Sequence, residues 1–226
     1  NFTSSLLVGH STTGTLDAAQ YNTGVGIAAL DAITSGDNNT ALGFGAGSGI
    51  TTGASNTLLG YRSGVALTTA GQNVAVGTNA LATNSTSGQD NVAVGFEALN
   101  RVTSGDNNIG IGTEAGDSIT TSRNNVLIGM DAGQNIVDGS GNIIIGTVDA
   151  AATDSARTLK ITSYDGSTTT NHIISDGSGN MTLAADLTIG DDFNMTTDSS
   201  VINFGADSDT TLTHTDGTGL TLNSTN

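Results

Sequence analysis

The chain has 226 residues and a formal net charge of −16, which arises from 21 acidic and 5 basic side chains. It contains no cysteine, which excludes disulfide bonds and cysteine-based metal or redox sites. Phosphate groups are bound by clustered Lys and Arg, so the charge disfavours nucleic acid and anionic membrane surfaces as partners.

A glycine recurs every 17 residues through the first two-thirds of the chain, with one step of 18 residues. Repetition at a fixed period is typical of stacked equivalent units. Seventeen residues cannot bury their own apolar side chains, but coils stacked at about 4.8 Å can. We therefore predict a parallel β-solenoid of about nine 17-residue coils over residues 1–150. The marker glycines are Gly9, Gly26, Gly43, Gly60, Gly77, Gly95, Gly112, Gly129 and Gly146.

An alternating apolar pattern precedes each glycine. The positions three and one residues before it hold mostly β-branched residues or leucine, as at Val92 and Val94 or Ile109 and Ile111. This alternation predicts a short strand, and we assign these two positions to its packed, inward face. After the glycine we predict a second short strand and then a turn rich in Gly, Asp and Asn.

The repeats carry more apolar residues than one inner face can hold. The position between the two packed ones is occupied by Leu58, Leu127 and Ile144 in three repeats, and other repeats place a leucine four residues after the glycine. Large exposed apolar strips are rare on soluble monomers. We therefore expect copies of the chain to associate along the length of the stack.

An asparagine stands four residues before the marker glycine in eight repeats. Stacked in register, such side-chain amides can bond to one another as a ladder. A row of ligand-binding amides is the alternative interpretation. The asparagines are Asn22, Asn39, Asn56, Asn73, Asn91, Asn108, Asn125 and Asn142.

The 17-residue period stops after Gly146, and residues 147–157 form a transition. Short alternating runs follow, such as residues 158–162, 181–183 and 187–189, separated by turns rich in Asp and Gly. These runs are too brief to form an ordinary sheet core alone. We expect residues 151–226 to form a slender β-shaft in which several chains share one apolar centre. The pattern is still running at the last residue, so we expect the chain to be part of a longer protein.

A search for reactive constellations is negative. The histidines, His10, His172 and His214, have no His or Cys partner at metal-ligand spacing, so we expect them to be solvated. Glycine-rich fragments that resemble dinucleotide loops recur at the repeat period and are explained as coil corners. Weak Ca²⁺ binding by turn aspartates stays open.

Close carboxylate pairs, which could cleave glycans, occur at residues 191–192 and 207–209 and one repeat apart at Glu97 and Glu114. We expect all of them to be solvated. The sequence therefore predicts no catalytic residue, no cofactor, no metal site and no enzymatic activity. No run approaches the ~18 apolar residues of a membrane-spanning helix, so we also expect no membrane insertion.

The repeats Asn-Val-Ala-Val-Gly-Thr-Asn-Ala-Leu, from Asn73, and Asn-Val-Ala-Val-Gly-Phe-Glu-Ala-Leu, from Asn91, resemble the head repeat of trimeric autotransporter adhesins. The resemblance covers residues 5–150 and implies a left-handed parallel β-roll, with three rolls packed about a threefold axis. The adhesin repeat is shorter, so the turn here is longer. Residues 186–193 and 201–214 resemble fibre proteins of marine bacteriophages, which implies an intertwined trimeric shaft.

From these patterns and resemblances we predict an extracellular structural fibre. The expected role is that of a phage tail fibre or virion appendage, a homotrimer that binds a glycan or protein receptor on the host surface. A bacterial trimeric surface adhesin is one alternative, and a glycan-cleaving tailspike is a second. A membrane anchor or secretion domain in the full-length gene would favour the adhesin.

Overall fold

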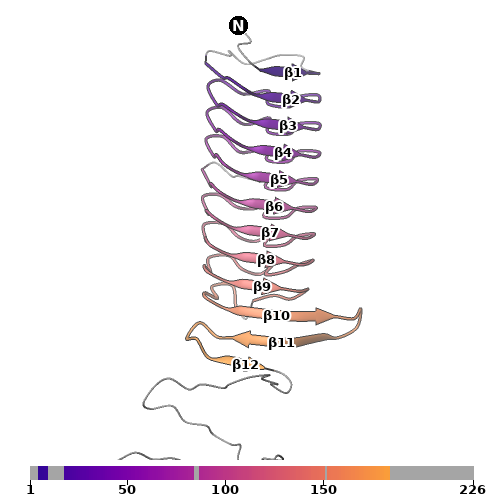
Figure 1. The fold of residues 1–226 in the computed structure, drawn as a ribbon, viewed down its shortest axis with the longest axis vertical. Helices are drawn as coiled ribbons and strands as arrows, with labels where there is room; N and C mark the ends of the chain where they lie inside the picture. Colours follow the sequence, from indigo (N-terminus) through magenta and orange to yellow (C-terminus); the bar gives the residue numbers. More distant parts are fainter. Residues whose placement is uncertain (1–4, 10–17, 84–86, 151, 184–226) are drawn as a thin grey trace, which may run out of the picture. The chain divides into compact units, whose positions relative to one another are not determined.

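The computed structural model of the chain describes residues 5–9, 18–83, 87–150 and 152–183, and within these ranges it contains strands and turns but no helix. The strands form one sheet in which each strand pairs with the next in chain order. Figure 1 shows the first nine as rungs that lie one above another. The strands are β1 (Leu6–Val8), β2 (Thr23–Val25), β3 (Thr40–Leu42), β4 (Thr57–Leu59), β5 (Val74–Val76), β6 (Val92–Val94), β7 (Ile109–Ile111), β8 (Val126–Ile128), β9 (Ile143–Ile145), β10 (Leu159–Tyr164), β11 (Thr169–Ser175) and β12 (Met181–Leu183).

Strands β1–β9 pair in parallel, and each residue lies beside its equivalent in the next repeat. Val94 pairs with Ile111 across the ordinary 17-residue step, and Val76 pairs with Val94 across the single 18-residue step. The chain therefore forms the parallel β-solenoid that its repeat predicts. At about 4.8 Å between rungs, nine rungs rise on the order of 40 Å.

The marker glycines form the corner at which each coil leaves its strand. Gly60 has a φ of +136°, and a Cβ added to it would lie 2.6 Å from the carbonyl oxygen of Gly77 in the next coil. A side chain at this corner would therefore meet both a disfavoured backbone conformation and the backbone of its neighbour. The repeat needs glycine here because successive corners touch one another.

The predicted facing of the strands is wrong. The middle residue of each strand from β2 to β9 points into the coil: Leu58 is 1% exposed, and Ala93 and Leu127 are fully buried. The two flanking positions point outward, and Ile111 is 37% exposed. Neighbouring strand residues face opposite sides, so an error of one position exchanges the two faces. The flanking positions hold the larger residues, and their size favours assigning them to the interior. The coil is narrow, however, and only the middle residue fits inside it.

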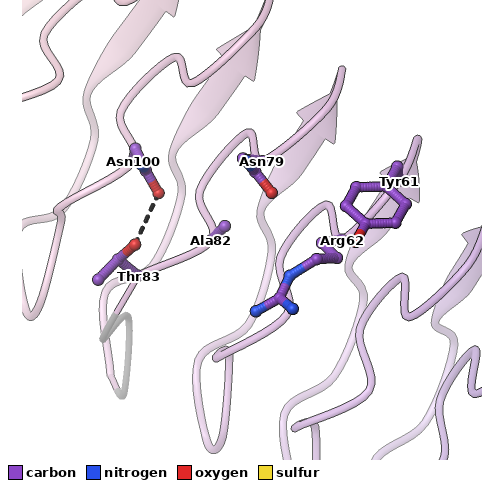
Figure 2. A pocket seen from close by; sticks show the side chains of 6 residues that line it. All are labelled: Tyr61, Arg62, Asn79, Ala82, Thr83 and Asn100. Atoms are coloured by element: carbon purple, nitrogen blue, oxygen red, sulfur yellow. Dashed lines mark hydrogen bonds between the residues drawn. The ribbon is translucent and has the colours of Figure 1, made fainter.

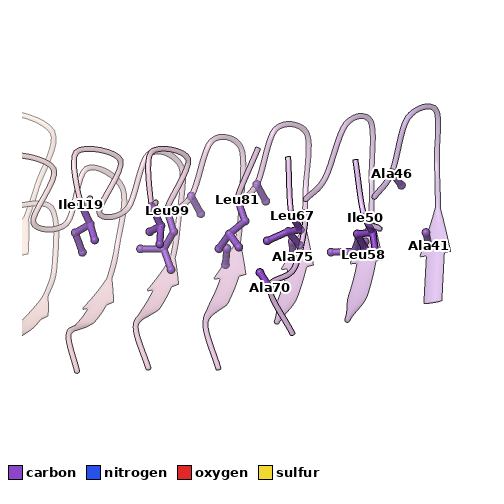
Figure 3. Packing of buried hydrophobic residues seen from close by; sticks show 14 of the residues in the cluster. Ala41, Ala46, Ile50, Leu58, Leu67, Ala70, Ala75, Leu81, Leu99 and Ile119 are labelled. Carbon is purple, nitrogen blue, oxygen red and sulfur yellow. The ribbon is translucent and has the colours of Figure 1, made fainter. Parts of the chain in front are cut away.

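The coil interior is filled by two positions whose sizes compensate for each other. Where the strand's middle residue is leucine, as at Leu58, the residue four after the corner is glycine, as at Gly64; where the middle residue is small, as at Ala75, that position is leucine, as at Leu81. Figure 3 shows the buried side chains between the strand and the opposite turn in successive coils. The leucines placed four after a corner are therefore core residues, and the outward surplus of apolar residues comes from the strand's flanking positions instead.

In two coils both positions hold a small residue, and side chains of the neighbouring coils fill the space. A Cβ at Gly47 would lie 2.7 Å from Leu58 and 3.0 Å from Leu30, which belong to the coils on either side. A Cβ at Gly116 would likewise lie 2.6 Å from Leu127 and 2.8 Å from Leu99. The core is thus a continuous column in which side chains interlock between coils at the density of a protein interior.

The second strand predicted after each corner is absent from the described coils. This segment consists of turns in which residues two and four after the glycine have positive φ, such as 52° at Glu97 and 49° at Leu99. Its backbone still bonds between coils, as in the 3.0 Å bond that the Leu99 N–H donates to the Ala115 carbonyl. The left-handed residues turn the backbone so that two consecutive residues, the small one three after the glycine (Ala98) and the next one (Leu99), both face inward. In an extended strand, consecutive residues would face opposite sides.

The pairing of the strands changes after the solenoid. Strand β10 pairs in parallel with β9, but β11 and β12 continue the sheet in antiparallel fashion, with a register shift between Ile161 and Thr162. Two of the predicted runs correspond to β10 and β12, whereas β11 was not anticipated. The predicted runs from residue 187 onward lie outside the described residues. The wrapped, multi-chain shaft stays a prediction.

Candidate functional site

The eight repeat asparagines form a buried column inside the solenoid. All are at most 2% exposed. The Nδ2 of Asn56 donates to Oδ1 of Asn39 at 2.9 Å and to the Ala70 carbonyl at 3.0 Å, while the Asn56 N–H donates to the same Oδ1 at 3.0 Å. The same set recurs up to Asn142, so these amide groups are satisfied by one another and by the backbone. Enclosed and bonded in this way, the column stabilises the corner and is closed to a ligand.

The outward positions of β1–β9 form a surface that we call the outer strand face: the residues three and one before each marker glycine. No residue of these nine strands is charged. This contrasts with the net charge of −16 for the whole chain. The most exposed apolar residues on it are Leu6, Val8, Leu42, Leu59, Ile111, Ile143 and Ile145, each 36% exposed or more. Together with Thr23, Thr40 and Thr57, these residues make the outer strand face uncharged and largely apolar.

A second column, one residue after each corner glycine, borders the outer strand face. It contains Ile27, Phe44, Tyr61, Phe96 and Met130, all between 45% and 62% exposed. The rings of Phe44 and Tyr61 stack with centroids 5.5 Å apart and an interplanar angle of 12°. These residues stand at the edge where the strand gives way to the turn.

The surface formed by the turn segments that follow the corner glycines, which we call the turn surface, carries two of the acids that the sequence analysis named, Glu97 and Glu114. Glu97 accepts a 3.2 Å bond from Nδ2 of Asn79, and Glu114 accepts a 2.7 Å bond from Nε2 of Gln134. Both glutamates are partly buried and held by amides of neighbouring coils. The described residues contain no group of three His, Asp or Glu side chains that could hold a metal ion. The acids at 191–192 and 207–209 lie outside the described ranges.

Asp117 is the most enclosed acid of this surface, and its side chain is 12% exposed. Burial raises the pKa of its carboxyl above the ordinary value, Arg101 at 3.7 Å opposes that rise, and Glu97 adds to it. Its Oδ1 is buried and has no hydrogen-bond partner among the described residues. The carboxylate is therefore enclosed, and Arg101 at 3.7 Å is its ion-pair partner.

Of the three histidines, only His172 falls in the described part of the chain. It lies exposed on β11, with its Nε2 2.9 Å from Oγ of Ser163 on β10. This agrees with the solvated position expected for it.

A cavity of about 340 Å³ opens on the turn surface across three successive coils. Figure 2 shows its lining: Tyr61 and Arg62 come from one coil, Asn79, Ala82 and Thr83 from the next, and Asn100 from the third. The middle coil is the one whose repeat is 18 residues long, from Gly77 to Gly95. Sequence reasoning noted this irregular coil but did not associate it with a site.

Comparison with known proteins leaves the chain without an assigned relative. No protein-family description matches the sequence, no curated protein is detectably similar, and no solved structure matches the fold. The part of the chain that the structure describes includes no helical segment with the length and hydropathy of a membrane span. The repeat architecture and its surfaces are therefore the basis for a functional proposal.

Proposed function

We propose that the chain is a structural fibre protein that assembles as a homotrimer through its outer strand face and reaches a host surface as part of a phage tail fibre or other virion appendage. The observation that carries the proposal is the uncharged apolar face along β1–β9. The apolar excess in the repeats and the resemblance to adhesin heads led to the same expectation.

Burial of the outer strand face is favourable because each square ångström of apolar surface removed from water contributes about 25 cal/mol. The face runs through all nine rungs, and its side chains are leucine or β-branched residues, of which the β-branched ones are stiff and suited to packing. A second and third copy would cover it with the same residues in the same register. A threefold arrangement closes the assembly and leaves no copy with an open apolar strip.

The charges lie elsewhere and suit this arrangement. The acidic residues Glu97, Glu114 and Asp131 follow their corner glycines by two residues, on the turn surface rather than on the strands. Trimers would therefore present like charge to one another, which opposes lateral aggregation. Stacked coils give a stiff rod on which weak receptor contacts can be repeated three times, so that multivalency raises the avidity.

The proposal is tested by placing a charge on the outer strand face. Ile111→Asp puts a carboxylate on an outward position, so we expect the coil to fold while self-association is lost, because an unpaired charge in a dry interface is strongly unfavourable. Sedimentation equilibrium measures the mass, and circular dichroism measures the fold. Thr52→Asp, on an exposed turn, is the matched control and should remain associated.

An Ile111→Asp variant that associates as the parent chain does would overturn the trimer proposal. The host-contact part is tested separately, by measuring adsorption of fluorescently labelled parent chain and Ile111→Asp to candidate bacterial hosts. Saturable adsorption that depends on association is the expected result. Adsorption to none of the hosts of phages that encode this chain would overturn the role in attachment while leaving the assembly intact.

A further inference from the structure

The cavity on the turn surface, lined by Tyr61, Arg62, Asn79, Ala82, Thr83 and Asn100, combines an aromatic ring, a cation and two amides in one place. Its volume of about 340 Å³ is at the small end of the range of about 300–1,000 Å³ that is usual for small-molecule sites. A pocket of this size suits one ring-shaped ligand unit rather than an extended chain. Ala82, only 8% exposed, is the most buried of the lining residues.

Tyr61 is one of the residues that line this cavity. One face of its ring stacks on Phe44 of the preceding coil, with centroids 5.5 Å apart. The next coil has Thr78 at the same repeat position, so no third ring continues the stack. The tyrosine is 49% exposed, and its ring lies at 12° to that of Phe44. A half-exposed aromatic ring with a polar hydroxyl tip is suited to the apolar face of a sugar ring.

Arg62 supplies the charge. Its side chain is exposed, and no hydrogen-bond or ion-pair partner for its guanidinium is found in the part of the chain that the structure describes. The chain has only 5 basic residues against 21 acidic ones. Arg101, which directly follows the cavity residue Asn100, is paired with Asp117 at 3.7 Å, and Glu97 accepts a bond from Asn79, so Arg62 is the cation among the lining residues whose charge is left for a ligand. The planar guanidinium donates two parallel bonds to a carboxylate, which gives strength and orientation.

The two amides have one group each left for a ligand. Asn100 accepts a 2.8 Å bond from the Thr83 hydroxyl through Oδ1, which leaves its Nδ2 as a donor. Asn79 donates to Glu97 through Nδ2, which leaves its Oδ1 as an acceptor. In Figure 2 the Asn79 side chain lies between Arg62 and the hydrogen-bonded pair of Thr83 and Asn100. A donor and an acceptor on one wall match the hydroxyl groups of a pyranose, each of which can donate and accept.

We propose that this cavity binds a single hexuronic acid residue, a carboxylate-bearing pyranose of a surface polysaccharide. Arg62 pairs with the carboxylate, Tyr61 lies against the ring, and Asn79 and Asn100 bind hydroxyl groups. The inference deepens the proposed host contact and rests on it, since a fibre that reaches a cell surface meets such saccharides. It locates that contact on the turn side, beyond the corner glycine, so the outer strand face stays available for assembly.

The test is a ligand-observed NMR titration of the purified chain with methyl β-D-glucuronide. Methyl β-D-glucoside provides the same ring without the carboxylate, and sodium acetate provides the carboxylate without the ring. We expect saturable binding of the glucuronide and at least tenfold weaker binding of each of the other two, because charged hydrogen bonds contribute about 1.5–3 kcal/mol and 1.4 kcal/mol is a factor of ten.

Arg62→Gln should reduce glucuronide affinity about tenfold or more and abolish the preference over the glucoside. Arg123→Gln removes the same charge from an exposed turn away from the cavity and should leave binding unchanged. Sedimentation of both variants should match the parent, which separates failure of this site from failure of the fibre proposal. Absence of glucuronide binding, equal affinity for glucuronide and glucoside, or equal binding by parent and Arg62→Gln would overturn the assignment.

Discussion

The parallel coils β1–β9 and the antiparallel strands β10–β12 belong to one sheet but bury their residues differently. In the solenoid, every middle strand residue from β2 to β9 is buried, whereas the seven residues of β11 include none. The pairing of strands is common to both regions. The difference is that each coil turns back over its own strand. This closure of the coil, rather than the pairing of the strands, creates an interior.

We expect the largest difference in stability between the two regions when one asparagine in each is replaced by alanine. Asn108→Ala should lower the free energy of unfolding by about 3 kcal/mol or more, because it removes the two bonds that the Asn108 side chain donates and leaves two Asn125 donors without their acceptor. Asn171→Ala, on exposed β11, should change it by less than about 0.5 kcal/mol. Urea unfolding at one fixed chain concentration measures both. Equal effects would contradict a structural role for the ladder.

Substitutions of glycine should distinguish the interlocked core from an open turn. Gly116→Ala should destabilise by about 2–4 kcal/mol, since it adds a methyl group 2.6 Å from Leu127 at a φ of +63°. Gly166→Ala, in the turn between β10 and β11, has a φ of +96° but nothing within 4 Å, so only the backbone penalty of about 1–2 kcal/mol applies.

The packing part of this difference can be isolated by a second substitution. Leu127→Val should relieve part of the Gly116→Ala penalty, and a double-mutant cycle measures the coupling energy, which contact predicts to be above about 0.5 kcal/mol. Strictly additive effects of the two substitutions would show that the side chains do not share one space.

The smallest expected effects concern pH, and they have opposite signs in the two regions. The pKa of Asp117 is raised by burial, so the folded state binds more protons than the unfolded state just above pH 3.8, and stability falls as pH rises through that window. The pKa of Asp176 is lowered, first by the Asn180 side chain, so its contribution is present above pH 3.8 and is lost as pH falls.

Asp117→Asn should therefore stabilise the protein at pH 7, by less than about 1 kcal/mol, with the gain disappearing near pH 4. Asp176→Asn should destabilise it at pH 7, with the loss disappearing at low pH. Thermal unfolding across this pH range measures both trends. Two variants with the same sign of pH dependence would contradict the assignment of burial to one site and hydrogen bonding to the other.

The sequence was sufficient for the stacking, because the spacing of Gly60 and Gly77 or of Asn39 and Asn56 translates directly into neighbours on successive rungs. It was not sufficient for the facing of the strands. Both faces of each strand are apolar, so alternation could not tell inside from outside, and Ile111 was placed on the wrong side. The reciprocal sizes of the strand middle and the position four after the corner were a usable signal that was missed.

The turn segment and the cavity were harder to anticipate. Residues such as Leu99 adopt positive φ because neighbouring coils hold them there, and nothing in their own chemistry indicates it. The cavity depends on three coils meeting at the one irregular step, and its residues are spread over positions 61 to 100. Neither is visible in a single repeat.

The most direct test of the account is the mass of the purified chain in solution, measured by sedimentation equilibrium. Because the outer strand face is uncharged and apolar along nine rungs, the account predicts a particle of three times the chain mass of 22.4 kDa. A folded particle of 22.4 kDa that stays dispersed at high concentration would contradict it.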